Sequence, residues 1–367
     1  MNLCDLAPAN IREIAPYQPG KPISELEREL GVTDIVKLAS NENPLGPSPR
    51  ALDALERAVG ELALYPDGNG FELKSALCRK FGLQMDQLVL GNGSNDVLEL
   101  AARAFLSPGS SAVYSQHAFA VYPLAVQATG ARGVEVPAKE FGHDLEAMRV
   151  AVDATTKLVF IANPNNPTGT FVDAPAVKAF IASLPERVLV VLDEAYTEYL
   201  PDNRRAKTFD WLEQLPNLII TRTFSKAYGL AGLRVGYACA HPQVADLMNR
   251  VRQPFNVNSL ALAAATAALD DADFLGRSYA LNEAGMRQLT EGVQRLGLSH
   301  IPSFGNFLSV KVGPAAEIYQ KLLRGGVIVR PVASYGMPEY LRVTVGLKEQ
   351  NDKFLRLLEA ALAPPAA

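Results

Sequence analysis

The chain has few cysteines and histidines, and their positions argue against two kinds of site. Its three cysteines, Cys4, Cys78 and Cys239, lie far apart in the 367 residues, so the sequence offers no disulfide framework. The four histidines show no metal-ligand spacing. We therefore expect no bound metal and a protein from a reducing compartment.

The chain also lacks long apolar runs and an excess of positive charge. Its longest alanine and leucine run, 260–269, is much shorter than the roughly 20 residues that a membrane span needs. Residues 1–16 mix acids, a base and prolines, without the apolar core of a signal peptide. The net charge of −4 predicts no basic face for nucleic acid. We expect a cytoplasmic protein that binds small molecules, with neither a membrane nor a nucleic acid as partner.

Short apolar runs alternate with helical stretches through the first two thirds of the chain. Several are apolar at successive positions, which is typical of strands buried on both faces. These runs are 87–90, 111–114, 157–162, 187–192 and 217–220. The fold class that they predict is α/β, with a mainly parallel sheet covered by helices.

The last third of the chain has a different pattern. A long helical stretch, 260–298, is followed by possible strands at 307–312, 327–330 and 341–345 that mix polar and apolar residues. Such strands suit a smaller α+β domain whose sheet has one wet face. We therefore expect an N-terminal arm over 1–30, a large domain over 31–258 and a small domain over 259–367. The arm is expected to pack with the small domain or a partner subunit.

The segment 221–237 combines one lysine with hydroxyls, glycines and an arginine in an otherwise apolar run. Lys226 can form a Schiff base with an aldehyde cofactor. Thr223, Ser225 and Arg234 can bind a phosphate nearby. Pyridoxal 5′-phosphate (PLP) is the obvious candidate, although this segment alone also allows another phosphate-bearing cofactor or an ordinary loop.

Asp193 directly follows an apolar strand and so lies at the strand's carboxyl end, where open α/β sheets bind their ligands. A buried carboxylate there needs a cationic partner, and a protonated pyridine nitrogen would supply one and keep the ring an electron sink. The alternative is that Asp193 caps a following helix. Taken alone, the residue favours that simpler interpretation.

Asn166 and Tyr196 follow apolar strands at the same edge of the sheet. Both side chains can donate a hydrogen bond to the ring oxygen of the cofactor, which would favour its phenolate form. Asn166 also belongs to the turn 163–169, rich in proline and asparagine, which has a structural role of its own.

Ser94 and Asn95 lie between a strand and the start of a helix. Backbone amides at a helix start bind anions, so these residues can join the phosphate site. A plain connection between strand and helix is the alternative. Phe119 can stack on the pyridine ring, although an aromatic in an apolar run more often belongs to the core.

Three further residues are candidates on weaker grounds. Tyr65 heads a turn-rich loop that can equally be structural. Arg330 and Arg342 lie on possible strands of the small domain, where most arginines are only solvated. An amino-acid substrate needs its carboxylate held, and a bidentate arginine is the usual solution.

The order Asn166, Asp193, Lys226, Arg234 resembles that of the fold-type I PLP-dependent aminotransferases, class I/II. Within that family the closest resemblance is to the histidinol-phosphate aminotransferases. The segments that support it are 38–44, 65–67, 163–169, 193–196, 225–226, 232–237 and 341–346. They extend over nearly the whole chain, and the lysine and aspartate segments are the most specific for the cofactor.

The resemblance implies a seven-stranded, mainly parallel sheet and a homodimer with the active site at the interface. It implies that Tyr65 reaches the cofactor phosphate of the partner subunit. Arg330 and Arg342 would hold the substrate phosphate or the carboxylate of glutamate, with Tyr17 and Asn306 nearby. The stacking position, often tyrosine in these enzymes, is Phe119 here, which keeps the stacking but not a hydroxyl hydrogen bond.

The reaction that the resemblance implies is L-histidinol phosphate + 2-oxoglutarate = imidazole-acetol phosphate + L-glutamate, in histidine biosynthesis. Lys226 would be both cofactor anchor and general base. Two alternatives stay open: an aromatic amino acid aminotransferase, and a PLP-dependent threonine-phosphate decarboxylase. A non-catalytic PLP-binding regulator is disfavoured, because the residues before Leu38 show no DNA-binding pattern.

Overall fold

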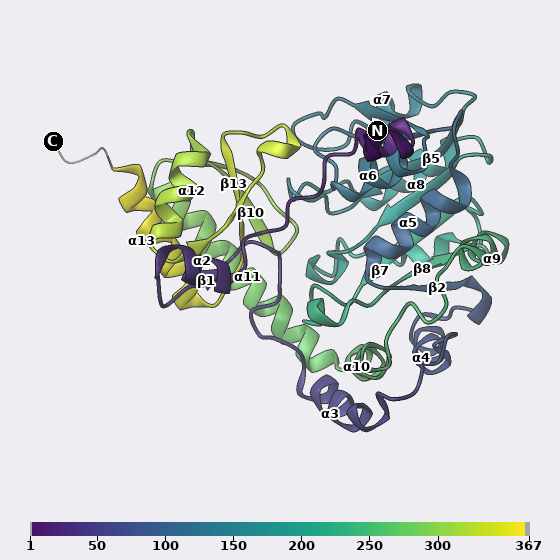
Figure 1. Ribbon diagram of the computed structural model, residues 1–367, viewed down its shortest axis with the longest axis horizontal. Coiled ribbons are helices and arrows are strands. Elements are labelled where there is room, and N and C mark those ends of the chain that lie inside the picture. Colours follow the sequence, from purple (N-terminus) through teal and green to yellow (C-terminus); the bar gives the residue numbers. More distant parts are fainter. Residues whose placement is uncertain (1, 364–367) are drawn as a thin grey trace.

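The computed structural model describes residues 2–363 and has two lobes joined by a long helix and by the N-terminal segment (Figure 1). The larger lobe is built on a seven-stranded sheet. Its strands, in spatial order, are β2 (Leu88–Gly91), β8 (Gly236–Ala240), β7 (Leu218–Thr223), β6 (Leu189–Asp193), β5 (Thr156–Ala162), β3 (Ser111–Ser115) and β4 (Arg132–Val136). All neighbours are parallel except at β8, which runs antiparallel to β2 and β7. The expected α/β fold with a mainly parallel seven-stranded sheet is confirmed.

The sheet is buried on both faces, as the continuous apolar runs predict. In β5, Leu158 and Phe160 face one core while Val159 and Ile161 face the other. The first core is closed by α5 (Ser94–Phe105), α6 (Val121–Ala128) and α9 (Pro242–Arg250). The second is closed by α3 (Pro49–Ala58), α4 (Phe71–Phe81), α7 (Leu145–Val150), α8 (Ala174–Ser183) and α10 (Ser259–Leu269). Alternate side chains of each strand therefore hold the two helical layers on opposite faces.

The smaller lobe contains a four-stranded antiparallel sheet backed by helices. Its strands, in spatial order, are β12 (Arg330–Pro331), β13 (Tyr340–Thr344), β10 (Phe307–Lys311) and β9 (Ser299–Ile301). The helices are α11 (Ala272–Arg295), α12 (Ala315–Arg324) and α13 (Lys348–Leu362). β1 (Val36–Lys37) pairs in parallel with β11 (Val327–Ile328), so an N-terminal strand belongs to this lobe.

The N-terminal segment contacts both lobes. α1 (Ala9–Arg12) lies on the larger lobe, where Asn10 donates to the backbone oxygen of Gln127 in α6. α2 (Ile23–Leu30) lies on the smaller lobe, where Leu26 packs against Leu323 and Ile328. Short 3-10 helices complete the secondary structure: η1 (Leu3–Leu6), η2 (Val59–Glu61), η3 (Met85–Gln87), η4 (Thr197–Tyr199), η5 (Thr208–Trp211), η6 (Ala231–Leu233) and η7 (Ala333–Tyr335).

The long helical stretch expected over 260–298 is two helices, α10 and α11. Asp271 ends the continuity, because its side chain accepts the backbone N–H of Phe274 and so caps α11. Ala261 and Leu269 of α10 belong to the core of the larger lobe. We therefore propose that the large domain ends after α10, about ten residues later than the boundary expected from the sequence.

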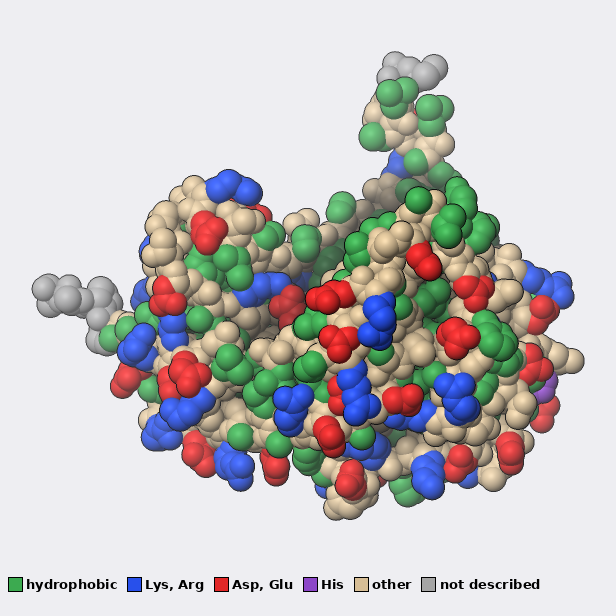
Figure 2. Space-filling model, turned by 90° about the horizontal axis from the view of Figure 1, so that it is seen from below, with side chains coloured by type: hydrophobic (Ala, Val, Ile, Leu, Met, Phe, Trp, Pro, Cys, Tyr) green, Lys and Arg blue, Asp and Glu red, His purple; other side chains and the backbone are tan. Residues whose placement is uncertain are grey.

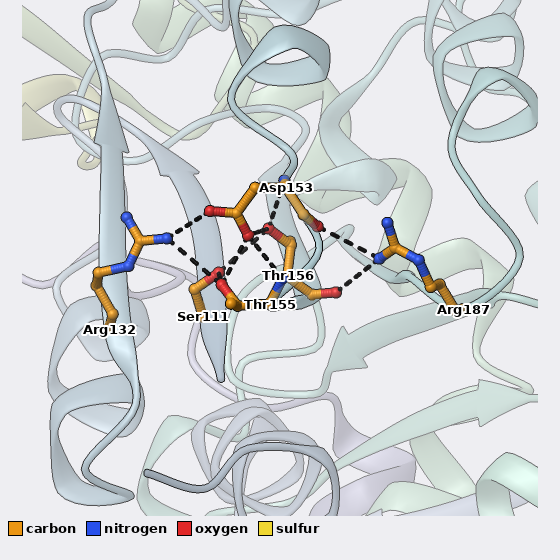
Figure 3. A network of polar contacts seen from close by, with 6 residues as sticks. All are labelled: Ser111, Arg132, Asp153, Thr155, Thr156 and Arg187. Atoms are coloured by element: carbon orange, nitrogen blue, oxygen red, sulfur yellow. Dashed lines mark hydrogen bonds and ion pairs between the residues drawn. The ribbon is translucent and has the colours of Figure 1, made fainter. Parts of the chain in front are cut away.

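Polar side chains hold β3, β4 and β5 together at their amino ends (Figure 3). The carboxylate of Asp153 accepts from Arg132 at 2.6 Å and from the hydroxyl of Thr155 at 2.6 Å. The hydrogen bonds from Thr155 are the main cause that keeps the pKa of Asp153 below its ordinary value. Arg187 donates to the backbone oxygens of Asp153 and Thr156. These contacts stabilise the sheet at the amino ends of the three strands. The carboxyl ends of the strands lie on the opposite side.

Candidate active site

A cavity of about 190 Å³ lies at the carboxyl ends of β5, β6 and β7, between the two lobes. The molecular surface is hollowed between the lobes (Figure 2). The cavity brings together most of the residues expected from the sequence: Tyr17, Ser94, Asn95, Phe119, Asn166, Asp193, Tyr196, Thr223, Ser225, Lys226, Arg234, Arg330 and Arg342. Two expected residues, Tyr65 and Asn306, do not line it.

Asp193 is the last residue of β6 and is 4% exposed. Its carboxylate accepts from the hydroxyl of Tyr122 at 2.8 Å and from that of Thr221 at 3.0 Å. Within residues 2–363 it forms no ion pair with a lysine or arginine, and burial raises its pKa. It does not cap a helix, because η4 begins at Thr197 with Tyr196 as its N-cap residue. This buried carboxylate lacks a cationic side-chain partner, so it suits a cationic ligand atom.

Lys226 follows β7 and points into the same cavity. Its Nζ atom donates to the backbone oxygen of Ser40 at 3.2 Å. Burial, and then the positive charge of Arg342, lower the pKa of Lys226 to about 8. The neutral form of this amine, which can act as a nucleophile or a base, is therefore favoured more than in an ordinary lysine.

An anion cradle lies between Arg234 and the start of α5. Arg234 donates to the Ser225 hydroxyl at 3.3 Å. Gly93 precedes α5 with a φ of +81°, and a Cβ atom there would lie 2.4 Å from Nη2 of Arg234. Within residues 2–363 no side chain caps the start of α5, so its first backbone N–H groups have no side-chain acceptor. Together with the positive charge of Arg234 and the hydroxyl of Ser225, they suit a phosphate.

Arg342 lies on β13 and is buried at the small-lobe wall of the cavity. It donates from Nη1 to Oδ1 of Asn166 at 2.5 Å and from Nη2 to the backbone oxygen of Ala39 at 2.7 Å. Its Nε atom is buried without a hydrogen-bond partner in the described chain, and burial lowers its pKa. Arg342 forms no ion pair with a carboxylate between residues 2 and 363, so its positive charge is available to bind an anionic substrate group.

Asn166 and Tyr196 line the cavity beside Lys226. Arg342 occupies the Oδ1 end of the Asn166 amide, which leaves the Nδ2 donors for the cavity. Burial is the main cause that raises the pKa of Tyr196 to about 12, so its hydroxyl stays protonated and can donate. Both side chains therefore have donors available at the cavity, and their contact with the cofactor ring oxygen stays a prediction.

The remaining expected residues differ in how closely they approach the site. Arg330 lies over the ring of Tyr17, 5.4 Å from its centroid, at the outer wall of the cavity. Asn306 is buried and donates to the backbone oxygens of Asn41 and Glu42, outside the cavity. Tyr65 is 82% exposed and stacks on Phe255. Its expected contact requires a second subunit and stays a prediction.

In the described chain, three side chains that hydrogen-bond to expected site residues were not themselves expected from the sequence. Tyr122 and Thr221 bind Asp193, and Asn41 donates to the hydroxyl of Tyr196 at 2.8 Å. Thr221 lies two positions before Thr223 on β7. Because alternate residues of a strand point to the same face, this spacing could have identified Thr221 from the sequence. Tyr122 lies in an apolar helix that resembles ordinary core. Asn41 belongs to the segment 38–44 that supports the family resemblance, but nothing in that segment indicates a contact with Tyr196.

Comparison with known proteins identifies the family. The model of the aminotransferase class I and II family matches residues 33–358. The chain belongs to this family. It is 65% identical over 362 residues to the histidinol-phosphate aminotransferase of Methylobacillus flagellatus, with 98% of each chain covered. It is 62% identical to histidinol-phosphate aminotransferase 2 of Nitrosospira multiformis, over 99% of this chain and 93% of the relative.

A solved structure agrees with this assignment to the aminotransferase family. The histidinol-phosphate aminotransferase of Sinorhizobium meliloti, crystallised in complex with pyridoxal 5′-phosphate, superposes with a TM-score of 0.89 and 31% identity, over 96% of each chain. The family and the fold expected from the order of Asn166, Asp193, Lys226 and Arg234 are confirmed.

The lowered pKa of Lys226 predicts how this aminotransferase reacts with an amine-specific reagent. In protein prepared without added cofactor, acetylation of Lys226 by acetic anhydride is expected to rise with pH and level off above a midpoint of about 8. The exposed Lys348 is the internal control, because its hydrogen bond with Asp352 raises its pKa. Its acetylation should still increase well above that midpoint. Peptide mass spectrometry measures both rates, and a shared midpoint would contradict the burial effect at Lys226.

Proposed function

We propose that this aminotransferase is a PLP-dependent histidinol-phosphate aminotransferase that catalyses L-histidinol phosphate + 2-oxoglutarate = imidazole-acetol phosphate + L-glutamate in histidine biosynthesis. The observation that supports it most is the buried Asp193 without a cationic side-chain partner, facing the same cavity as Lys226 and the Arg234 cradle. The two relatives at 62% and 65% identity, both named histidinol-phosphate aminotransferase, support the choice of substrate.

The side chains of the cavity fit PLP group by group. Lys226 would hold the aldehyde carbon, and Asp193 would pair with the pyridine nitrogen. Asn166 and Tyr196 would donate to the ring oxygen, and Phe119 would cover the ring face. The phosphate would be bound by Ser94, Asn95, Thr223, Ser225 and Arg234. When bound, PLP withdraws electrons from the bonds at the substrate Cα.

Lys226 supplies the general base for the reaction. When its amine does not hold the aldehyde carbon, Lys226 would take the proton from the Cα atom of the substrate. Burial and the positive charge of Arg342 lower the pKa of this amine and so favour its neutral form. Asp193, held by Tyr122 and Thr221, keeps a negative charge at the far end of the cofactor site. Arg342 and Arg330 orient the substrate through its anionic group, which is the phosphate of histidinol phosphate or a carboxylate of glutamate.

We further propose a homodimer with shared active sites. Leu64 and Tyr65 are 69% and 82% exposed and lie in one loop, next to the half-exposed Phe255. An exposed apolar cluster of this kind is typical of a protein interface. In the dimer, Tyr65 would reach the cofactor phosphate of the partner subunit.

We place the enzyme in the cytoplasm. Cys4, Cys78 and Cys239 are all free thiols, which suits a reducing compartment. No helix within residues 2–363 has both the length and the apolar character to cross a membrane. Cell fractionation followed by immunoblotting tests this placement, and recovery of the protein in a periplasmic fraction would contradict it.

Substrate choice is tested with the PLP-loaded enzyme by following its visible absorbance as amines are added. Histidinol phosphate is expected to change the spectrum at a much lower concentration than phenylalanine or threonine phosphate. Lys226→Ala should lower transaminase turnover by at least about 10²-fold, because the base is lost. Lys157→Ala, which removes an exposed lysine on β5, is the matched control and should leave turnover unchanged.

Other outcomes of this titration would identify a different enzyme. A preference for phenylalanine would favour the aromatic aminotransferase, and carbon dioxide release from threonine phosphate would favour the decarboxylase. Near-normal turnover by Lys226→Ala would contradict the proposed mechanism altogether.

Mixing two inactive variants tests the shared active site. Tyr65→Ala and Lys226→Ala each damage every site of their own homodimers. A mixed dimer has one site with both residues intact, so random exchange should restore about a quarter of the native activity. Light scattering gives the oligomeric state and turnover gives the rescue. Dimers that exchange subunits but regain no activity would show that Tyr65 acts in its own subunit. Normal activity of the Tyr65→Ala homodimer would show that Tyr65 has no role.

A further inference from the structure

Residues 39–42 cross between the lobes and contact several side chains of the site. The backbone oxygens of Ala39 and Ser40 accept from Arg342 and Lys226. Asn41 is 1% exposed and has a φ of +55°, a left-handed conformation that asparagine tolerates better than most residues. The segment is therefore held in one conformation beside the site.

The direction of the hydrogen bond between Asn41 and Tyr196 is fixed by a third residue. The hydroxyl of Thr344 accepts the backbone N–H of Asn41 at 2.9 Å and donates to its Oδ1 atom at 3.2 Å. Nδ2 of Asn41 therefore faces Tyr196 and donates to its hydroxyl oxygen at 2.8 Å. An amide nitrogen cannot accept a hydrogen bond, so the phenol proton of Tyr196 must point elsewhere.

We infer that Asn41 is a positioning residue that directs the hydroxyl proton of Tyr196 into the cavity, toward the ring oxygen of the cofactor. The inference deepens the proposed function and rests on it, because the acceptor is the ring oxygen of PLP. Without Asn41, the phenol could rotate its proton toward the space that the amide leaves. The donor to the ring oxygen would then be lost part of the time.

The same contacts couple the direction of this proton to the smaller lobe. Thr344 lies on β13 of the small lobe, whereas Tyr196 follows β6 of the large lobe. Asn306, which precedes β10, donates to the backbone oxygen of Asn41 at 3.1 Å and holds the segment from the same side. Residues of the small lobe therefore hold the amide that orients the Tyr196 hydroxyl.

A double-mutant cycle on the PLP-loaded enzyme tests this role without substrate. The variants are Asn41→Gly, which tolerates the left-handed backbone, Tyr196→Phe, and the two combined. Because a hydrogen bond to the ring oxygen favours its ionised form, Asn41→Gly should raise the pH midpoint of the cofactor's visible absorbance change by about one pH unit. Tyr196→Phe should raise it at least as far, and the double variant should match Tyr196→Phe.

A second readout is PLP affinity, followed by quenching of the fluorescence of the single tryptophan, Trp211. Asn41→Gly should weaken PLP binding in the native background and have little effect in the Tyr196→Phe background.

Thr344→Ser should keep the native pH midpoint of the absorbance change, whereas Thr344→Val should move it in the direction of Asn41→Gly. Asn351→Ala is the matched control and should leave the midpoint unchanged, since within residues 2–363 this buried side-chain amide hydrogen-bonds only to Gln288 and Gly346.

The inference would be overturned by an equal shift in both backgrounds, or by no shift in the native background. If Asn41→Gly does not fold, Thr344→Val in the two backgrounds gives the same comparison. Wild-type protein that binds no PLP would overturn the proposed function as well. A preference for phenylalanine would change the substrate proposal and leave this inference intact, because the cycle uses no substrate.

Discussion

The buried carboxylate of Asp193 is the feature on which the arrangement of the site depends. It ends β6 at the centre of the sheet, and two hydroxyls hold it in place, but neither neutralises its charge. A buried charge is costly unless it is paired, so this position is stable only if a cation is present or if the group takes up a proton. The other cavity residues surround the space where a ring with a protonated nitrogen would fit.

The neighbouring residue shows how the same sheet treats a charge that needs no ligand. Glu194 accepts two hydrogen bonds from Arg222, at 2.9 and 2.8 Å, and one from Thr208. The guanidinium of Arg222 lies 4.2 Å from the ring centroid of Phe209. This ion pair is buried and complete within the protein. Asp193 has no such partner within residues 2–363 and lines the cavity, which Glu194 does not. We therefore propose that Asp193 binds a ligand and that Glu194 is structural.

The strand ends could be predicted from the sequence because apolar runs mark buried strands and the next polar residue then lies at the sheet edge. Asn166 and Asp193 were found in this way, whereas Lys226 was found from the hydroxyls, glycines and arginine around it. The structure places all three in one cavity. Asn41 and Tyr122 act through contacts between distant segments, which no local pattern encodes. Asn306 was expected only from the family resemblance. The break between α10 and α11 depends on capping by Asp271, a single residue within a long helical pattern. Tyr65 depends on a second subunit.

The most direct test of the central claim is the protonation state of the cofactor nitrogen opposite Asp193. PLP labelled with nitrogen-15 in the pyridine ring can be bound to the native enzyme and to Asp193→Asn, and its chemical shift measured by NMR. The native enzyme should show a protonated ring nitrogen across the neutral pH range, because the buried carboxylate stabilises the cation. Asp193→Asn should show the unprotonated form. The same shift in both proteins would contradict the account.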